Sequence, residues 1–332
     1  MILFENEASD AAFYLAAEDY IMREGKIDEP VLLFWIIDDT VVIGANQVLK
    51  AEVDEAYTRE AGITIARRPS GGGAIFTDKG GLQFTVILPY SENSETFDPK
   101  TCMRQWLAEP LIDTLDRYGV KALHEGRNDV VIDGKKVSGL SQYVKNGYIC
   151  SHGTLIFSTD LEKLVKALTV DSEKIVSKAI ASVRARVTQI SEYISEKDTR
   201  AFCEALIDSY GRIEKIVRKE FTEDEQKEIY KIKSEKYGND EWIYGHEPAF
   251  TFTNQKRFPG GKIEVFLDVK GGVIQNAKIK GDFLAVKPVG SIEEGFVGIR
   301  HREDDLRDVL GKLDVETILG SITENELLEV LV

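Results

Sequence analysis

Apolar residues recur with two different spacings along this chain, and the spacing distinguishes its predicted strands from its predicted helices. Every second residue of the segment 82–88 is apolar, which predicts a strand with one buried face. Apolar residues at helical spacing predict a helix that is capped by Ser9 and runs to about Arg23. A further helix is predicted over 101–118, and Gly119 is expected to form its C-terminal cap.

Short apolar runs that flank turn residues predict three hairpins. Asp-Gly at 133–134 and Asn-Gly at 146–147 are typical of two-residue hairpin turns. A third hairpin is predicted from the β-branched runs 31–37 and 40–44. We expect the 133–134 and 146–147 hairpins to lie on a sheet that is continuous with a glycine-rich turn at 70–73.

The pattern of predicted elements changes from about Glu241. Two strands are predicted at 263–269 and 273–280, and helices follow near 303–310 and 324–331. We therefore predict an α+β protein in which a mixed β-sheet domain flanked by helices spans residues 1–244. A small C-terminal α+β domain is predicted for residues 245–332.

Composition limits the possible functions. The chain has 332 residues, 43% of them hydrophobic, which is enough for a large domain and a small one. Its formal charge of −15 argues against a nucleic-acid or anionic-membrane surface. No signal sequence or spanning segment is recognisable, so we expect a cytoplasmic protein. The three widely separated cysteines are expected to be reduced thiols.

The glycine-rich turn carries the first candidate chemistry. Ser70 precedes three consecutive glycines, and Arg67 and Arg68 lie just upstream. Glycines let several N–H groups approach a ligand closely, so the stretch suits a phosphate or an acyl phosphate. A tight turn with a solvated arginine pair is the alternative. Neither the Walker nor the Rossmann motif fits this pattern.

A second cluster surrounds the predicted turn at 133–134. Asn128 and Asp129 are expected to lie near Ser138 and Gly139, because the two strands of a hairpin are antiparallel. Lys135 and Lys136 would point to opposite faces, so only one of them can enter the buried side of the sheet. A solvated lysine pair at a hairpin edge is the alternative.

Four segments in order resemble the lipoate-protein ligase A family, and the resemblance covers most of the chain. They read RRPSGGGAIF, GRNDVVIDGKKVSG, SHGTLIF and KAIASVRARVTQI. The resemblance implies a biotin/lipoate ligase-like catalytic domain over 1–244 and the accessory domain of the family over 245–332. It also implies ATP as co-substrate with Mg²⁺, lipoate as substrate, and lipoyl-AMP as intermediate. The acceptor would be a lysine of an E2 lipoyl domain, a glycine-cleavage H protein or an H-like protein.

The resemblance gives individual residues expected roles. Lys136 would contact the lipoyl carboxyl group and the phosphate as the catalytic residue, and Asp129 would help to hold Mg²⁺. Ile75 and Phe76 would also wall the aliphatic tail, and His152 would either contact the ligand or be satisfied within the sheet. The expected ATP and lipoyl-AMP site comprises Arg68, Ser70, Gly71, Gly72, Gly73, Ala74, Ile75, Phe76, Asn128, Asp129, Lys136, Ser138, Gly139, His152, Gly153, Thr154 and Lys178.

Three positions depart from the family pattern, and two other functions stay open. Ala45, Thr77 and Gly81 stand where family members usually have a basic residue, histidine and asparagine. An ATP-independent octanoyl- or lipoyltransferase would need a cysteine nucleophile, and Cys150, the closest thiol, is expected to be a buried strand residue. A catalytically silent lipoate-binding protein is the other alternative.

Overall fold

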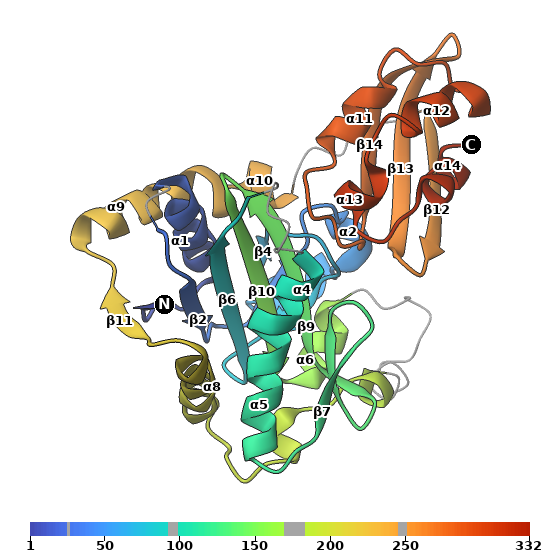
Figure 1. The fold of residues 1–332 in the computed structure, drawn as a ribbon. Coiled ribbons are helices and arrows are strands. Elements are labelled where there is room, and N and C mark those ends of the chain that lie inside the picture. The colour runs from blue at the N-terminus through green and yellow to red at the C-terminus, as the bar shows by residue number, and fades with distance from the viewer. Residues whose placement is uncertain (25–26, 92–98, 169–182, 245–250) are drawn as a thin grey trace.

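The larger of two domains is built on a mixed eight-stranded sheet (Figure 1). The computed structural model describes residues 1–24, 27–91, 99–168, 183–244 and 251–332. The sheet has the order β11-β1-β2-β6-β10-β9-β8-β7, in which β11, β1 and β2 are parallel and the remaining neighbours antiparallel. Its strands are β1 (Ile2–Glu5), β2 (Val31–Trp35), β6 (Gly81–Pro89), β7 (Ala122–Glu125), β8 (Asp129–Ile132), β9 (Lys135–Lys145), β10 (Tyr148–Ile156) and β11 (Val217–Glu220). The predicted mixed sheet is confirmed.

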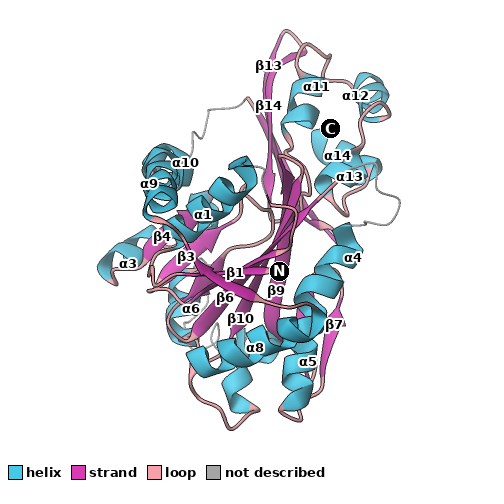
Figure 2. Cartoon of the chain, turned by 60° about the vertical axis from the view of Figure 1, so that its left-hand side comes forward, coloured by secondary structure: helices cyan, strands magenta, loops and turns pink. Residues whose placement is uncertain are grey.

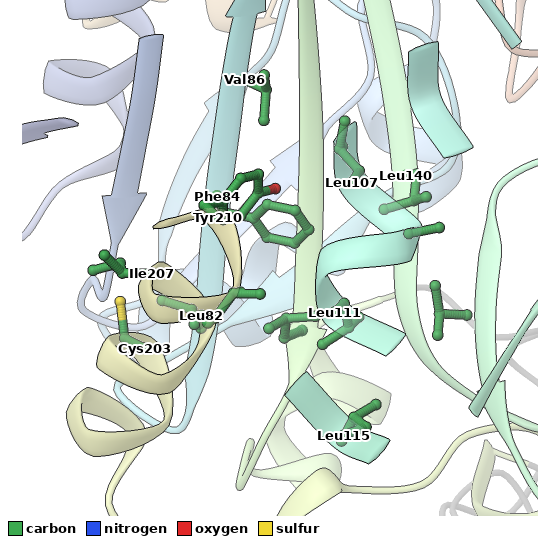
Figure 3. Close-up of a cluster of buried hydrophobic side chains, with 14 of the residues drawn as sticks. Leu82, Phe84, Val86, Leu107, Leu111, Leu115, Leu140, Cys203, Ile207 and Tyr210 are labelled. Atoms are coloured by element: carbon green, nitrogen blue, oxygen red, sulfur yellow. The ribbon is translucent and has the colours of Figure 1, made fainter. Parts of the chain in front are cut away.

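Helices cover both faces of this sheet (Figure 2). One face packs on α1 (Ala11–Glu24) and α9 (Glu223–Ile232), and the other on α5 (Glu109–Arg117) and α8 (Thr199–Ile213). Figure 3 shows the core on the face that α5 and α8 cover, where the alternate residues of β6 meet the leucines around α5 and the side chains of α8. The predicted apolar face of segment 82–88 is therefore confirmed as buried, but the opposite face is buried too, so the expectation of a single buried face is wrong. The shorter helices are α2 (Leu49–Glu52), α3 (Glu55–Glu60), α4 (Pro99–Met103), α6 (Leu161–Ala167) and α10 (Asp240–Tyr244).

The predicted hairpin over 31–44 is wrong. Strand β2 belongs to the large sheet, whereas β3 (Thr40–Ile43) lies between β4 (Thr64–Arg67) and β5 (Ile75–Thr77) in a separate three-stranded sheet. The physical reason is burial, since successive residues of β3 enter two different cores. The glycine-rich turn therefore belongs to the smaller sheet. The expectation that it is continuous with the larger sheet is wrong.

Local signals predicted turns better than caps. Asp133 and Asn146 both have φ of 50° in the expected hairpin turns, and Gly119 has φ of 77° after α5. The first helix begins at Ala11, and the carboxylate of Asp10, not the predicted Ser9, accepts the hydrogen bond of its first turn.

The C-terminal domain has its own sheet and core. Strands β12 (Phe252–Phe258), β13 (Gly261–Lys270) and β14 (Val273–Gly281) pack on α11 (Gly290–Phe296), α12 (Glu303–Leu310), α13 (Val315–Leu319) and α14 (Glu324–Leu331). The predicted small α+β unit is confirmed, although β12 and α11 were not predicted. The boundary after Tyr244 stays a prediction, because residues 245–250 lie outside the described part. None of the described helices has the length and apolar character needed to span a bilayer.

Candidate active site

Most of the predicted site residues line one cavity of about 120 Å³ between the two sheets of the larger domain. The large sheet contributes β2, β6, β9 and β10, and the small sheet contributes β3, β5 and the glycine-rich loop. The lining residues are Trp35, Val42, Arg68, Gly72, Gly73, Ala74, Ile75, Gln83, Asn128, Lys136, Gly139, Leu140, Ser141, His152, Gly153 and Thr154. Segments that are far apart in the sequence, around residues 70, 130 and 153, therefore meet at one place.

Lys136 and Asp129 form an ion pair at this cavity. The Lys136 Nζ atom lies 2.7 Å from Oδ1 of Asp129, and the two side chains are 35% and 37% exposed. Gly139 lies opposite Asp129, and a Cβ atom there would come within 2.9 Å of the Lys136 amine. The glycine thus leaves room for the ammonium group, which stays accessible to an incoming anion.

The neighbouring residues fix the strand that carries this lysine. Asn128 holds β9 through two bonds, since its amide donates to the Leu140 carbonyl at 2.9 Å and its carbonyl accepts from the Leu140 N–H at 2.7 Å. On the other side, the N–H of Thr188 donates to the carbonyl of Lys136 at 3.0 Å. Ser138 lies opposite Val130, a member of the core under α5, and so does not face the cavity. Lys135 is not among the lining residues, as the alternation of the strand requires.

The two arginines before the glycine-rich loop hold different stretches of backbone. The Arg68 guanidinium donates to the carbonyls of Val42, Gly71 and Gly73 at 3.1, 2.7 and 2.8 Å. Burial lowers the pKa of Arg68 to about 10. Arg67 likewise donates to several backbone carbonyls. Arg68 therefore holds the loop backbone in shape and also forms part of the cavity wall, whereas Arg67 holds the turn at residues 44–47 beside the loop.

The three glycines of the loop have different surroundings. A Cβ atom on Gly71 would lie 2.6 Å from the carbonyl oxygen of Phe283, in the C-terminal domain. Gly72 has φ of 90°, and its N–H donates to the same oxygen at 3.1 Å. Gly73 has no atom within 4 Å of its Cβ position and lines the cavity. Gly71 therefore permits contact between domains, and Gly73 leaves space for a ligand.

A buried polar network lies at the inner end of the cavity. His152 Nε2 is 2.8 Å from the carboxylate of Glu18, and His152 Nδ1 is 3.2 Å from the hydroxyl of Ser70. Glu18 also accepts a hydrogen bond from Thr85 at 2.6 Å, and Thr85 accepts one from the indole of Trp35 at 3.1 Å. His152 is thus hydrogen-bonded within the sheet and also lines the cavity.

Four residues at the site were not predicted from the sequence, namely Glu18, Trp35, Gln83 and Ser141. Glu18 and its neighbour Asp19 interrupt the apolar stripe of the first helix, and both are fully buried. Buried carboxylates require partners, so this interruption was a usable signal. The other three lie on strands, where nothing in the local pattern distinguishes a cavity wall from ordinary core.

Two carboxylates near the cavity differ in their suitability for a metal. Asp129 is partly exposed beside the site, which suits Mg²⁺, a cation that takes few protein carboxylates and keeps waters or phosphate oxygens. Glu18, Cys150 and His152 also lie close enough together to share an ion, but all three are buried and already hydrogen-bonded. Burial raises the pKa of the Cys150 thiol well above its ordinary value, and this thiol does not line the cavity.

Some expected site residues lie elsewhere. Phe76 packs into the core between the small sheet and α6. Of the two residues expected to wall the aliphatic tail, Ile75 therefore lines the cavity and Phe76 does not. Lys178 lies outside the described residues. Among the departing positions, Thr77 accepts a hydrogen bond from Gln83 at 2.9 Å, and a Cβ atom on Gly81 would lie 2.5 Å from the Thr77 hydroxyl. The threonine and the glycine are therefore matched to each other.

A larger cleft of about 580 Å³ lies away from this cavity, along β1, β11 and α8. It contains none of the predicted site residues. Size alone would favour this cleft, but the lysine, the glycine loop and the buried histidine all belong to the smaller cavity.

The fold and the site define a protein of the lipoyl ligase class. Residues 10–211 match the family described as Lipoyl protein ligase A/B catalytic domain, and residues 247–331 match Bacterial lipoate protein ligase C-terminus. The lipoate-protein ligase LplJ of Bacillus subtilis is 35% identical, with all of both chains covered. Lipoate-protein ligase 1 of Staphylococcus aureus is 32% identical over 98% of both chains. The chain therefore belongs to the lipoate-protein ligase family.

Solved structures agree with this assignment. A Thermoplasma acidophilum structure of a bi-partite lipoate protein ligase and its E2 lipoyl domain has a TM-score of 0.67 and 29% identity, covering 76% of this chain and 98% of that one. A lipoate-protein ligase A bound with ATP has a TM-score of 0.63 and 27% identity, with 73% and 98% covered. Plasmodium falciparum LipL1, with a TM-score of 0.81 and 22% identity over 99% and 98% of the chains, shows the shared fold.

Proposed function

We propose that this chain activates lipoate with ATP to form lipoyl-AMP and then transfers the lipoyl group to a lysine of a carrier protein. The observation that carries the proposal is the pairing of Lys136 with Asp129 at a cavity that has apolar side chains and glycine residues in its lining. A fatty acid with a terminal carboxylate and a nucleotide phosphate need this combination of surfaces.

The geometry suggests how the ligands are arranged. The aliphatic tail lies along Trp35 and Ile75, so that its carboxylate meets the ammonium group of Lys136. The α-phosphate of ATP lies against the open main chain at Gly73 and the same ammonium group. Asp129 would hold Mg²⁺, which when bound neutralises phosphate charge. Lys136 leaves its ion pair with Asp129 to bind the two anions.

No covalent bond to the enzyme is needed in this scheme. The lipoate carboxylate attacks the α-phosphorus, and pyrophosphate leaves. The acceptor amine then attacks the carbonyl carbon of lipoyl-AMP, AMP leaves, and the amine loses a proton. The protein supplies alignment and neutralises charge on mutually repelling anions.

The cavity must enlarge when substrates bind. Its volume of about 120 Å³ is smaller than the roughly 300–1,000 Å³ of typical small-molecule sites. The segment 281–286 of the C-terminal domain lies against Gly71 and Gly72, so movement of this segment is one way to open the loop side. Relatives that bind ATP or pair with an E2 lipoyl domain support the choice of ligands and acceptor.

Lipoate-dependent ATP–pyrophosphate exchange tests the proposal. We expect exchange in the unaltered chain and a loss of roughly 10²–10³-fold or more in Lys136→Ala, because one preorganised charge is removed. Lys135→Ala is the matched control, since the neighbouring lysine lies on the other face, and Cys150→Ala is expected to behave like the unaltered chain. A cysteine-dependent transferase or a silent binder would show no exchange, and normal exchange in Lys136→Ala would exclude the role given to that lysine.

A further inference from the structure

Strand β7 exposes a large apolar side chain at the outer edge of the sheet. It is the last strand in the order of the large sheet, next to β8. Leu123, in its middle, is 68% exposed, the highest value among the exposed large hydrophobic side chains of the described residues. Burying a leucine is worth about 1.5–3 kcal/mol, so a partner that covers this side chain would gain binding free energy of that order.

The register of the sheet places Leu123 on the same face as Lys136. Leu123 is paired with Val131 on β8, and Val131 is paired with Lys136 on β9. Directly paired residues project to the same side of a sheet, so the three form one row across three strands. The next row contains Glu125, Asp129 and Gly139. The ion pair between Lys136 and Asp129 confirms that these rows share one face.

The distance between the exposed leucine and the site suits a bound carrier domain. Neighbouring strands lie about 4.8 Å apart, so β7 is about 10 Å from β9. A small domain of about 100 residues has a radius of gyration of about 13 Å. A domain seated on Leu123 therefore also reaches the cavity where Lys136 lies.

We infer that Leu123 and the outer edge of β7, which pairs with no further strand among the described residues, are the docking surface for the acceptor protein, an inference that rests on the proposed function. The occupant is a folded carrier domain that presents its target lysine beside an apolar surface patch. Contact with Leu123 aligns the carrier so that its lysine amine approaches the acyl-adenylate from the rim formed by Asp129 and Glu125.

The test compares two half-reactions in variants of the full-length chain. With an apo E2 lipoyl domain as acceptor, Leu123→Lys is expected to lower kcat/KM for transfer by about tenfold or more, chiefly through KM. Lipoate-dependent ATP–pyrophosphate exchange should stay unchanged. Ile213→Lys is the matched control, because Ile213 is 50% exposed at the end of α8, and it should change neither reaction.

Further measurements separate the other outcomes. Leu123→Ser removes the apolar contact without adding charge and should show the same selective loss. Unchanged transfer in Leu123→Lys would overturn the inference, and so would a proportional loss of exchange and transfer in both variants. A dimer that Leu123→Lys dissociates would assign the edge to a second copy and also overturn it. Supplying synthetic lipoyl-AMP tests docking even if exchange is absent, in which case only the proposed activation step fails.

Discussion

Replacing Gly71 with alanine should loosen the contact between the domains without entering the ligand cavity. The added Cβ atom would lie 2.6 Å from the carbonyl oxygen of Phe283 and 2.9 Å from the nitrogen of Ala285. Both are backbone atoms, so no side chain can rotate to relieve the overlap, and the segment 281–286 must move. Overpacking of this kind costs about 1–3 kcal/mol.

The expected effect can be measured at single amide groups. The Gly72 N–H donates to Phe283, and the Gly281 N–H donates to Asn46 at 2.6 Å, so both amides report on the docked state. A cost of about 1–3 kcal/mol corresponds to an about 5–150-fold larger population of the open state, and the amide exchange of these two groups is faster by the same factor. Amide hydrogen exchange followed by mass spectrometry or NMR should show this acceleration in Gly71→Ala, while β13 and β14 keep their protection.

Gly73→Ala is the matched control for this prediction. Its Cβ atom meets nothing within 4 Å, and Gly73 has no positive φ that would strain alanine. Amide exchange at Gly72 and Gly281 should be unchanged, whereas substrate binding should weaken because the methyl group projects into the cavity. Equal rates of amide hydrogen exchange in the two variants, or an unchanged rate in Gly71→Ala, would refute the division of roles within the glycine loop.

Three other substitutions test the core and the buried charges by urea unfolding. Gly153→Ala should destabilise the chain by about 1–3 kcal/mol, because its Cβ atom would overlap the ring of buried Phe84; an unaltered midpoint would contradict this. Arg68→Lys should cost about 2–4 kcal/mol, since one ammonium group cannot serve the three carbonyls that the guanidinium serves, and a neutral result would show that the loop holds its shape without it. Burial opposes the charged form of Asp19, but hydrogen bonds, first from Lys145, outweigh burial and lower its pKa. Asp19→Asn should therefore lose stability at pH 7, and the difference should shrink as the pH falls below about 4, the unfolded value; a constant difference would exclude this linkage.

The local sequence was enough to predict most elements and the residue types of the site. Asp-Gly and Asn-Gly turns, alternation along β6 and the glycine cap after α5 depend on neighbours in the chain, so they could be predicted from the sequence. The four family segments also predicted the glycine loop, Lys136 and Asp129, which the fold brings to one cavity.

The structure decided how these elements are combined. The split of β2 and β3 between two sheets was not predictable locally, because both runs are equally apolar and only the surrounding cores distinguish them. The hydrogen bond between Glu18 and His152 could not be predicted either, because the two residues lie 134 positions apart and only the packing of distant segments brings them together.

The sequence by itself determined the backbone freedom of the glycine loop, the charge of Lys136 and the order of strands along the chain. Only the tertiary structure decided that Gly71 faces the C-terminal domain while Gly73 faces the cavity, and that Leu123 shares a face with Lys136. The physical reason is that a residue's conformational range and charge are local properties, whereas its contacts depend on which distant segments pack against it.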